Sequence, residues 1–124
     1  MLFIKIGIIF SMLTVIIGAF GAHSLSNIIG DKMDTFKTGV QYQMFHSLAL
    51  IIIGILSKVF EVDLSTTGYF FIIGIILFSG SLYLISIYKY SFLGMVAPIG
   101  GLSFIIGWVL LFYKISNLKT FSVI

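Results

Sequence analysis

Polar side chains able to bind a ligand are scarce within or beside the apolar runs of this sequence: they are His23, Gln41, Gln43 and His46. Ionisable groups in such runs are candidates for function because burying them in hydrocarbon costs free energy. Two neutral imidazoles could bind haem iron axially, or hold a metal ion with Gln43 or with a loop carboxylate such as Asp34. A single imidazole at membrane depth could instead relay protons or handle a substrate.

A structural role for His23 and His46 is the alternative interpretation. The two side chains would lie together near the face opposite the termini, each bonded to a carbonyl that closes the turn between the first two spans. Enzyme signatures are otherwise absent from the sequence, which has no phosphate-binding loop, zincin spacing of histidines or nucleophile elbow. Glu61 and Asp63 flank a connection without a third group to complete a catalytic site. The sequence thus predicts a protein that is not an enzyme and has no cofactor, with haem or metal at the two histidines as the alternative.

The composition places the chain in a membrane. Of its 124 residues, 60% are hydrophobic and 9% are charged, whereas soluble domains carry about 25% charged residues. Four helical spans of about 20 residues would take up roughly 80 positions, so we expect a single integral membrane domain over 1–124. The apolar runs cover 2–22, 41–57, 67–87 and 92–113. Because the connections between them are short, the predicted fold is an all-α, antiparallel four-transmembrane-helix bundle.

The first connection is predicted to be amphipathic. Between positions 24 and 39, apolar residues recur at helical spacing among four charged residues. Such a helix lies at the membrane interface and continues into the second span, with Asp31 or Asp34 as its N-cap. The first run also begins like a signal peptide, but its apolar stretch exceeds the usual ~7 to 15 residues. We therefore expect it to remain as a span.

Lysines and tyrosines indicate how the bundle sits in the bilayer. The face of the termini carries Lys5, Lys58, Lys114 and Lys119, and the opposite face carries Lys32, Lys37 and Lys89. Positive charge in short loops sets orientation, so this bias, together with the amino terminus, predicts a cell-membrane protein with both termini in the cytoplasm. Aromatic rings prefer the two interfaces. The expected interfacial tyrosines are Tyr42, Tyr88 and Tyr90 on one face and Tyr69 and Tyr113 on the other.

Small residues form stripes on the predicted spans. Helices in lipid associate by close packing, for which glycine and serine let the backbones approach. The expected helix-packing positions are Gly7, Ser11, Gly18, Gly21, Gly80, Gly101 and Gly107. Pro98 is expected about two turns into the fourth span, where it would free the carbonyl of Gly94 and kink the helix. That carbonyl could bind an ion or a substrate, or be satisfied by a neighbouring hydroxyl.

Four strings of the sequence resemble one family. They are GAFGAH at 18–23, YQMFH at 42–46, FSGSLY at 78–83 and APIGG at 97–101, followed by Gly107 and Trp108. Their order and spacing are similar to those of the YgdD and YwdK-like family of small bacterial membrane proteins. The resemblance spans all four apolar runs and implies a four-span inner-membrane protein, but it brings no activity with it. It places His23 and His46 within family motifs without giving them a role.

Three classes of function remain open. Because packing surfaces dominate the sequence, the leading hypothesis is a non-enzymatic, structural or accessory membrane protein that acts in a homo-oligomer or with other membrane proteins in the lipid bilayer. The second is a small solute or ion carrier, which would need a dimer or larger assembly because four spans enclose little volume. The third is a redox subunit with haem or metal at His23 and His46. Nucleic acid is not expected as a partner, since the seven lysines are scattered singly and arginine is absent.

Overall fold

The computed structural model describes residues 1–118, and helices make up nearly all of this range. The elements are α1 (Leu2–His23), α2 (Ser26–Ile29), the 3-10 turn η1 (Gly30–Lys32), α3 (Met33–Val59), α4 (Ser65–Gly74), the π-helical segment η2 (Ile75–Ser79), α5 (Gly80–Tyr88), the 3-10 segment η3 (Ser91–Met95) and α6 (Ala97–Ser116). Four stretches within them are long and apolar enough to cross a membrane: Leu2–His23, Ser26–Val59, Ser65–Tyr88 and Ser91–Ser116.

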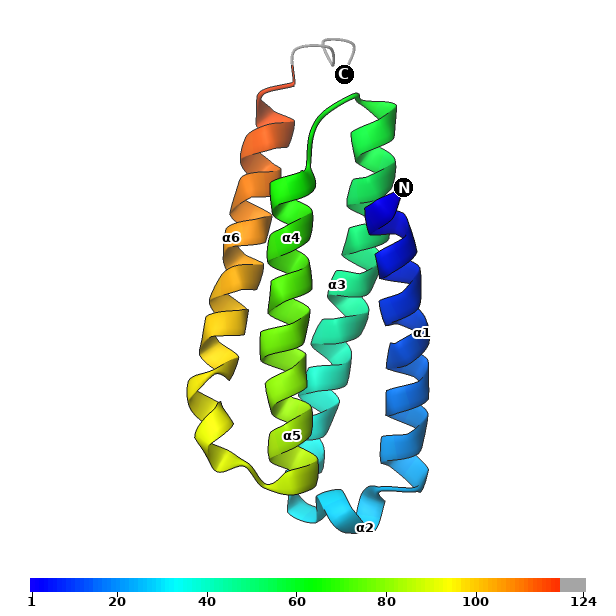
Figure 1. The fold of residues 1–124 in the computed structure, drawn as a ribbon, viewed down its shortest axis with the longest axis vertical. Coiled ribbons are helices and arrows are strands. Elements are labelled where there is room, and N and C mark those ends of the chain that lie inside the picture. The colour runs from blue at the N-terminus through cyan, green and yellow to red at the C-terminus, as the bar shows by residue number, and fades with distance from the viewer. Residues whose placement is uncertain (119–124) are drawn as a thin grey trace.

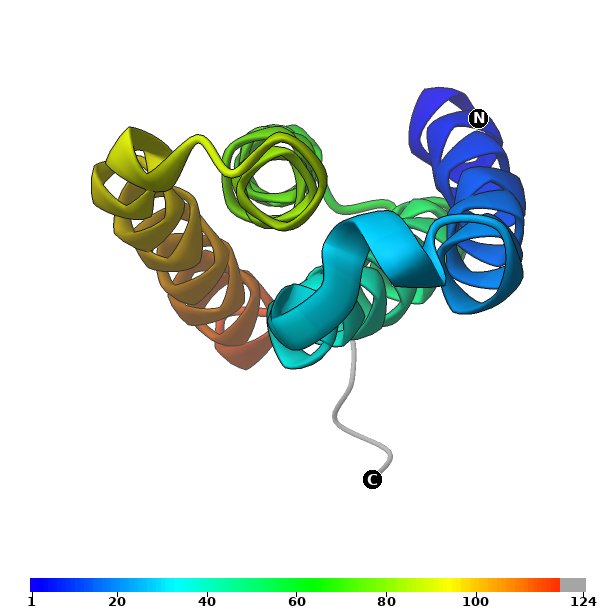
Figure 2. The ribbon, with the colours of Figure 1, turned by 90° about the horizontal axis from the view of Figure 1, so that it is seen from below.

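The four long helical stretches run antiparallel, so that Leu2 and Ser116 lie at one end of the bundle and α2 lies at the other (Figure 1). α1 packs along α3, and α6 packs along α4 and η2. α3 joins these two pairs through its contacts with η2 and α5. Seen from the end, α1 and α6 therefore lie on opposite sides of the molecule (Figure 2). The predicted all-α, antiparallel four-span fold is confirmed.

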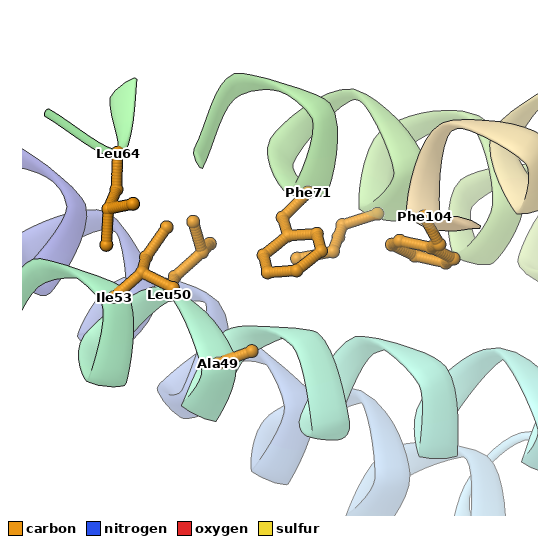
Figure 3. Packing of buried hydrophobic residues seen from close by; sticks show 7 residues of the cluster. Ala49, Leu50, Ile53, Leu64, Phe71 and Phe104 are labelled. Atoms are coloured by element: carbon orange, nitrogen blue, oxygen red, sulfur yellow. The ribbon is translucent and has the colours of Figure 1, made fainter. Parts of the chain in front are cut away.

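The core lies between α3 and the third and fourth helical stretches (Figure 3). Its buried members are Ala49, Leu50, Ile53, Leu64, Phe71, Ile75 and Phe104. In lipid these contacts supply dispersion and close packing rather than a gain from leaving water, because the surrounding chains are as apolar as the core. Shape complementarity between the helices therefore holds the bundle together.

The helix of the first connection runs on into the second span, as the sequence predicts. α3 begins at Met33 and continues to Val59, but neither Asp31 nor Asp34 caps it with a side-chain hydrogen bond. Tyr42 lies within α3. A residue after α5 stabilises this first connection, because Lys89 Nζ donates to the carbonyl of Ile29 at 2.7 Å. Lys89 itself ends α5 in the left-handed conformation, with φ of 60°.

The glycine stripes match the structure only in part. A Cβ at Gly7 would lie 2.7 Å from the Ser47 carbonyl oxygen, and one at Gly21 or Gly107 would overlap the ring of Phe36 or Phe71. Ser11 donates to the carbonyl of Gly7 at 2.8 Å, within its own helix. The prediction of close helix contact is wrong at Gly18, Gly80 and Gly101, where an added Cβ would meet only ordinary contacts or open space. Helical spacing finds a stripe, but it does not show which stripe faces a neighbouring backbone.

Four further glycines make close approaches. An added Cβ would collide with Ile4 at Gly54, with Phe3 at Gly68, with Phe104 at Gly74 and with the backbone of Leu77 and Phe78 at Gly100. Glycine thus allows close contact between α1 and α3, between α1 and α4, and between α6 and the third helical stretch.

The predicted kink at Pro98 is also wrong in its position. The change from 3-10 to α-helix comes at Val96, and Pro98 belongs to the first turn of α6. An N–H in the first turn of a helix has no intrahelical partner, so proline costs nothing there and its fixed φ favours helix initiation. Pro98 thus begins α6 instead of bending it, and no carbonyl is freed in the middle of a helix.

Candidate functional site: a lateral groove between α3 and α6

The structure separates the two histidines. His23 is exposed at the end of α1, whereas His46 is buried in the middle of α3. Gly21, beside His23, packs on Phe36, and Phe36 lies ten residues before His46, which is about 15 Å along a helix that rises 1.5 Å per residue. The expected meeting of the two imidazoles, whether for haem, for metal or for closing the turn, is therefore wrong.

His46 has a partner at each ring nitrogen. Nδ1 lies 2.9 Å from the carbonyl oxygen of Tyr42, and the indole nitrogen of Trp108 lies 2.9 Å from Nε2. Because a carbonyl only accepts and an indole N–H only donates, Nδ1 carries the proton and Nε2 accepts from Trp108. The imidazole is thus neutral, and neither nitrogen is free to bind a metal. Its ring stacks on Phe104, with centroids 3.6 Å apart and planes 10° apart.

A groove of about 790 Å³ opens between α3 and α6 above this stacked pair. Aromatic and aliphatic side chains dominate its lining, which consists of Gln41, Tyr42, Phe45, His46, Phe78, Pro98, Gly101, Leu102, Phe104, Ile105 and Trp108. A smaller apolar hollow of about 260 Å³, bounded by Leu48, Ile52 and Leu111, shares Phe45 and Trp108 with the groove. The two hollows form one seam along α3, which we call the α3–α6 groove.

The groove faces the outside of the bundle, and its lining residues belong to helical stretches that are long and apolar enough to cross a membrane. The side chains on its rim are strongly exposed: Phe45 is 61% exposed, Leu102 55% and Ile105 60%. In a bilayer these surfaces contact hydrocarbon rather than water. The groove can therefore admit an apolar molecule sideways from the membrane.

A second polar cluster, centred on Gln43, links three of the four helical stretches on the far side of α3. Gln43 Nε2 donates to the Phe10 carbonyl of α1 at 2.9 Å, and the Tyr83 hydroxyl of α5 donates to Gln43 Oε1. Thr14 also donates to the carbonyl of Phe10, at 2.7 Å. Polar side chains in lipid stabilise a bundle by such hydrogen bonds between helices. Gln43 therefore positions helices and does not join His46 in a ligand site.

The π-helical segment η2 gives the third helical stretch its contacts on both sides. Ser79 donates to the Gly39 carbonyl of α3 at 2.7 Å, and Gly100 of α6 lies against the backbone of Phe78. On the other side of the groove, Ser103 donates to the Phe70 carbonyl at 2.7 Å. A π-helical turn often lies at a functional site. Here it brings Phe78 between α3 and α6, where its ring is 4.7 Å from that of Tyr42.

Acidic groups contribute little to this arrangement. Asp63 accepts hydrogen bonds from the hydroxyl and the backbone N–H of Ser65, at 2.6 and 3.0 Å, and these donors lower the pKa of Asp63. Its carboxylate therefore organises the start of α4. Within residues 1–118, no three histidine or acidic side chains lie close enough together to hold a metal ion.

Three of the four motif strings contribute side chains to the lining of the α3–α6 groove. Tyr42 and His46, Phe78, and Pro98 and Gly101 all line it, whereas the string at 18–23 lies away from it on α1. Trp108 and Phe104 are the site residues that sequence reasoning missed, although Trp108 follows the last string. Trp108 is the only tryptophan of the chain, and this could have marked it in the sequence as a candidate site residue.

These features define a small, multi-pass membrane protein: an antiparallel helical bundle with a hydrogen-bonded interior and a lateral groove between α3 and α6. Residues 17–101 match the family model described as "Protein of unknown function (DUF423)". Its relatives carry the name UPF0382 membrane protein, and this chain belongs to that family. The match confirms the resemblance to YwdK-like proteins that the four strings indicated.

Curated relatives cover almost the whole chain. UPF0382 membrane protein SH2409 of Staphylococcus haemolyticus is 43% identical over 111 residues, which is 89% of this chain and 91% of the relative. YwdK of Bacillus subtilis is 44% identical over 112 residues, with 88% and 91% covered. UPF0382 membrane protein SSP2132 of Staphylococcus saprophyticus is 39% identical over 110 residues, with 88% and 92% covered. No solved structure matches the chain.

Proposed function

We propose that this chain is a non-enzymatic, accessory membrane protein that holds a hydrocarbon chain of a membrane lipid in the α3–α6 groove. The observation that carries the proposal is the groove, whose larger part has a volume of about 790 Å³. It is lined mainly by aromatic and aliphatic side chains and is open on the outer side of the bundle. Ligand sites are concave and mostly apolar, with few polar groups. The polar groups at the base of this groove, His46 and Trp108, already satisfy each other.

We keep the accessory role expected from the sequence, but we assign it to the α3–α6 groove rather than to stripes of small residues. Stripes of small residues suggested an oligomer or a larger complex, yet Gly7, Gly21 and Gly107 are occupied by helices of the same chain. The carrier hypothesis also loses support, because the polar cluster around Gln43 bonds three helices together instead of lining a path. A lateral groove with a paired base favours holding a lipid chain over moving a solute.

For the orientation, we propose that both termini lie in the cytoplasm. Lys5, Lys58 and Lys114 lie near the start of α1, the end of α3 and the end of α6, which share one end of the bundle. Lys32, Lys37 and Lys89 lie in η1, at the start of α3 and after α5, which share the other end. Lys119, which gives the terminal end its excess in the sequence, lies outside the described residues. The charge bias over the whole sequence supports this orientation.

Quenching of tryptophan fluorescence by brominated lipid chains tests the proposed function. Trp108 is the only tryptophan and it lines the groove, so its emission reports on the groove alone. The full chain would be reconstituted in phosphatidylcholine vesicles that contain lipids with brominated acyl chains. We expect strong quenching in the parent chain and weaker quenching in Gly101→Leu, because Gly101 lines the groove and a Cβ there meets only Phe78, at 3.7 Å.

Gly80→Leu is the matched control for this experiment. An added Cβ at Gly80 meets nothing within 4 Å, and Gly80 does not line the groove. This variant should be quenched like the parent chain. Equal quenching of the parent chain and Gly101→Leu would show that no lipid chain enters the groove, and would overturn the proposal.

A further inference from the structure

We infer that the lipid held in the α3–α6 groove is an anionic glycerophospholipid, whose phosphate is bound by Lys37 and whose acyl chain fills the groove; the inference rests on the proposed function. The juxtaposition that supports it is a gradient of polarity along one face of α3. Lys37, Gln41, Phe45, Leu48 and Ile52 follow one another at spacings of three or four residues, and all five are exposed. Side chains at such spacings lie above one another on one helix face.

The order of these side chains matches the order of groups in a glycerophospholipid. Lys37 lies about one turn inside the end of α3 that faces the headgroup region, and Gln41 follows one turn, or about 6 Å, further into the membrane. An ammonium group suits a phosphate, and an amide can donate to an ester carbonyl. Beyond Gln41 the wall becomes apolar at Phe45, where an acyl chain would begin to run along the groove.

Lysines outnumber acidic groups by one at this end of the bundle, where Lys32, Lys37 and Lys89 lie near Asp31 and Asp34. Lys32 and Lys37 are both exposed, and the long stem of a lysine lets its ammonium group reach the interface. Lys89 is already occupied, because it donates to the carbonyl of Ile29. Asp34 precedes Lys37 by one turn on α3, so its carboxylate opposes the attraction for phosphate. Lys37 lines a separate hollow of about 200 Å³ against α1, and this hollow shares Gln41 with the groove. Lys37 is thus the cation next to the groove, and the carboxylates of Asp31 and Asp34 limit its selectivity.

Competition between headgroups tests this inference with the same fluorescence signal. The full chain would be placed in unbrominated phosphatidylcholine vesicles that contain a small fraction of brominated lipid, with either a phosphatidylglycerol or a phosphatidylcholine headgroup. We expect about fivefold tighter binding of the phosphatidylglycerol, which is the factor that one lysine near an anionic headgroup supplies. Lys37→Gln should remove this preference while quenching by brominated phosphatidylcholine persists.

Two further variants control the assignment. Lys58→Gln changes an exposed lysine at the opposite end of α3 and should keep the preference. Asp34→Asn should increase it, because the opposing carboxylate is neutralised. Equal quenching by both headgroups in the parent chain would overturn the anionic inference and leave the lipid groove standing. Equal quenching of the parent chain and Gly101→Leu would overturn the proposal that the groove holds a lipid chain. A second protein helix found in the groove in place of a lipid would overturn it as well.

Discussion

At the scale of single residues, the hydrogen bond between His46 and Trp108 joins a side chain of α3 to a side chain of α6. It lies among aromatic rings, since Phe104 stacks on the imidazole and Phe71 lies 4.8 Å from the indole. Both polar groups are satisfied, so the pair adds a specific contact without leaving a buried charge. The position of α6 relative to α3, and hence the width of the groove, depends on this contact.

Removing the donor should weaken the bundle. Trp108→Phe keeps an aromatic ring but leaves Nε2 of His46 without its partner, and interhelical hydrogen bonds in membranes contribute about 0.6 to 1.7 kcal/mol. We expect a loss of that size in the free energy of unfolding, measured by detergent titration of the reconstituted protein.

A double-mutant cycle distinguishes the hydrogen bond from packing. In a His46→Phe background, Trp108→Phe should cost less by about 0.5 to 1.5 kcal/mol, because the partner is already absent. If the two substitutions are additive instead, the hydrogen bond does not stabilise the pairing of α3 with α6.

The sequence predicted some residue roles and missed others for a physical reason. His46 and Gln43 were correctly identified as unusual, because a polar group in a long apolar run is visible locally. Their partners are Trp108 and Tyr83, which lie 62 and 40 residues away in the chain. Contacts at such separations depend on how the helices rotate against one another, and a single sequence carries no direct record of that rotation.

At the scale of elements, α6 lies so close to the π-helical segment η2 that a Cβ added at Gly100 would overlap the backbone nitrogen of Phe78. Hydropathy predicted the existence of all four spans because it averages over about 20 residues. It did not predict η2, since a π-helical turn depends on local contacts rather than on mean apolarity. The neighbours Gly100 and Gly101 also show what hydropathy cannot predict. They are adjacent in the sequence, but a Cβ at Gly100 would meet the backbone of η2, whereas one at Gly101 would meet only the ring of Phe78.

Leucine substitutions at these adjacent glycines should have opposite outcomes. Gly100→Leu forces a side chain into the backbone at Leu77 and Phe78, and overpacking of this kind costs about 1 to 3 kcal/mol or more because a backbone cannot move aside. An added Cβ at Gly101 makes only an ordinary contact with the ring of Phe78, at 3.7 Å, so Gly101→Leu should be neutral within about 0.5 kcal/mol. Thermal melting in detergent measures both, and similar losses for the two variants would contradict the placement of α6 against η2.

At the scale of the whole molecule, the antiparallel arrangement puts Leu2, the connection around Glu61 and the end of α6 on one side of the membrane. Reporters fused after Ile124 and inserted between Glu61 and Ser65 should therefore give the same signal, and one inserted beside Lys32 the opposite one. If both termini lie in the cytoplasm, the first two reporters should give the signal of a cytoplasmic location. Disagreement between the first two would contradict the four-span arrangement, and agreement on the outer side would reverse the orientation.

Native mass spectrometry of the gently extracted full chain shows directly whether the α3–α6 groove holds a lipid chain. We expect the parent chain and Gly80→Leu each to retain a single phospholipid, and Gly101→Leu, whose new side chain fills the groove, to lose it. Retention of the same lipid by Gly101→Leu, or a lipid-free parent chain, would contradict this proposal.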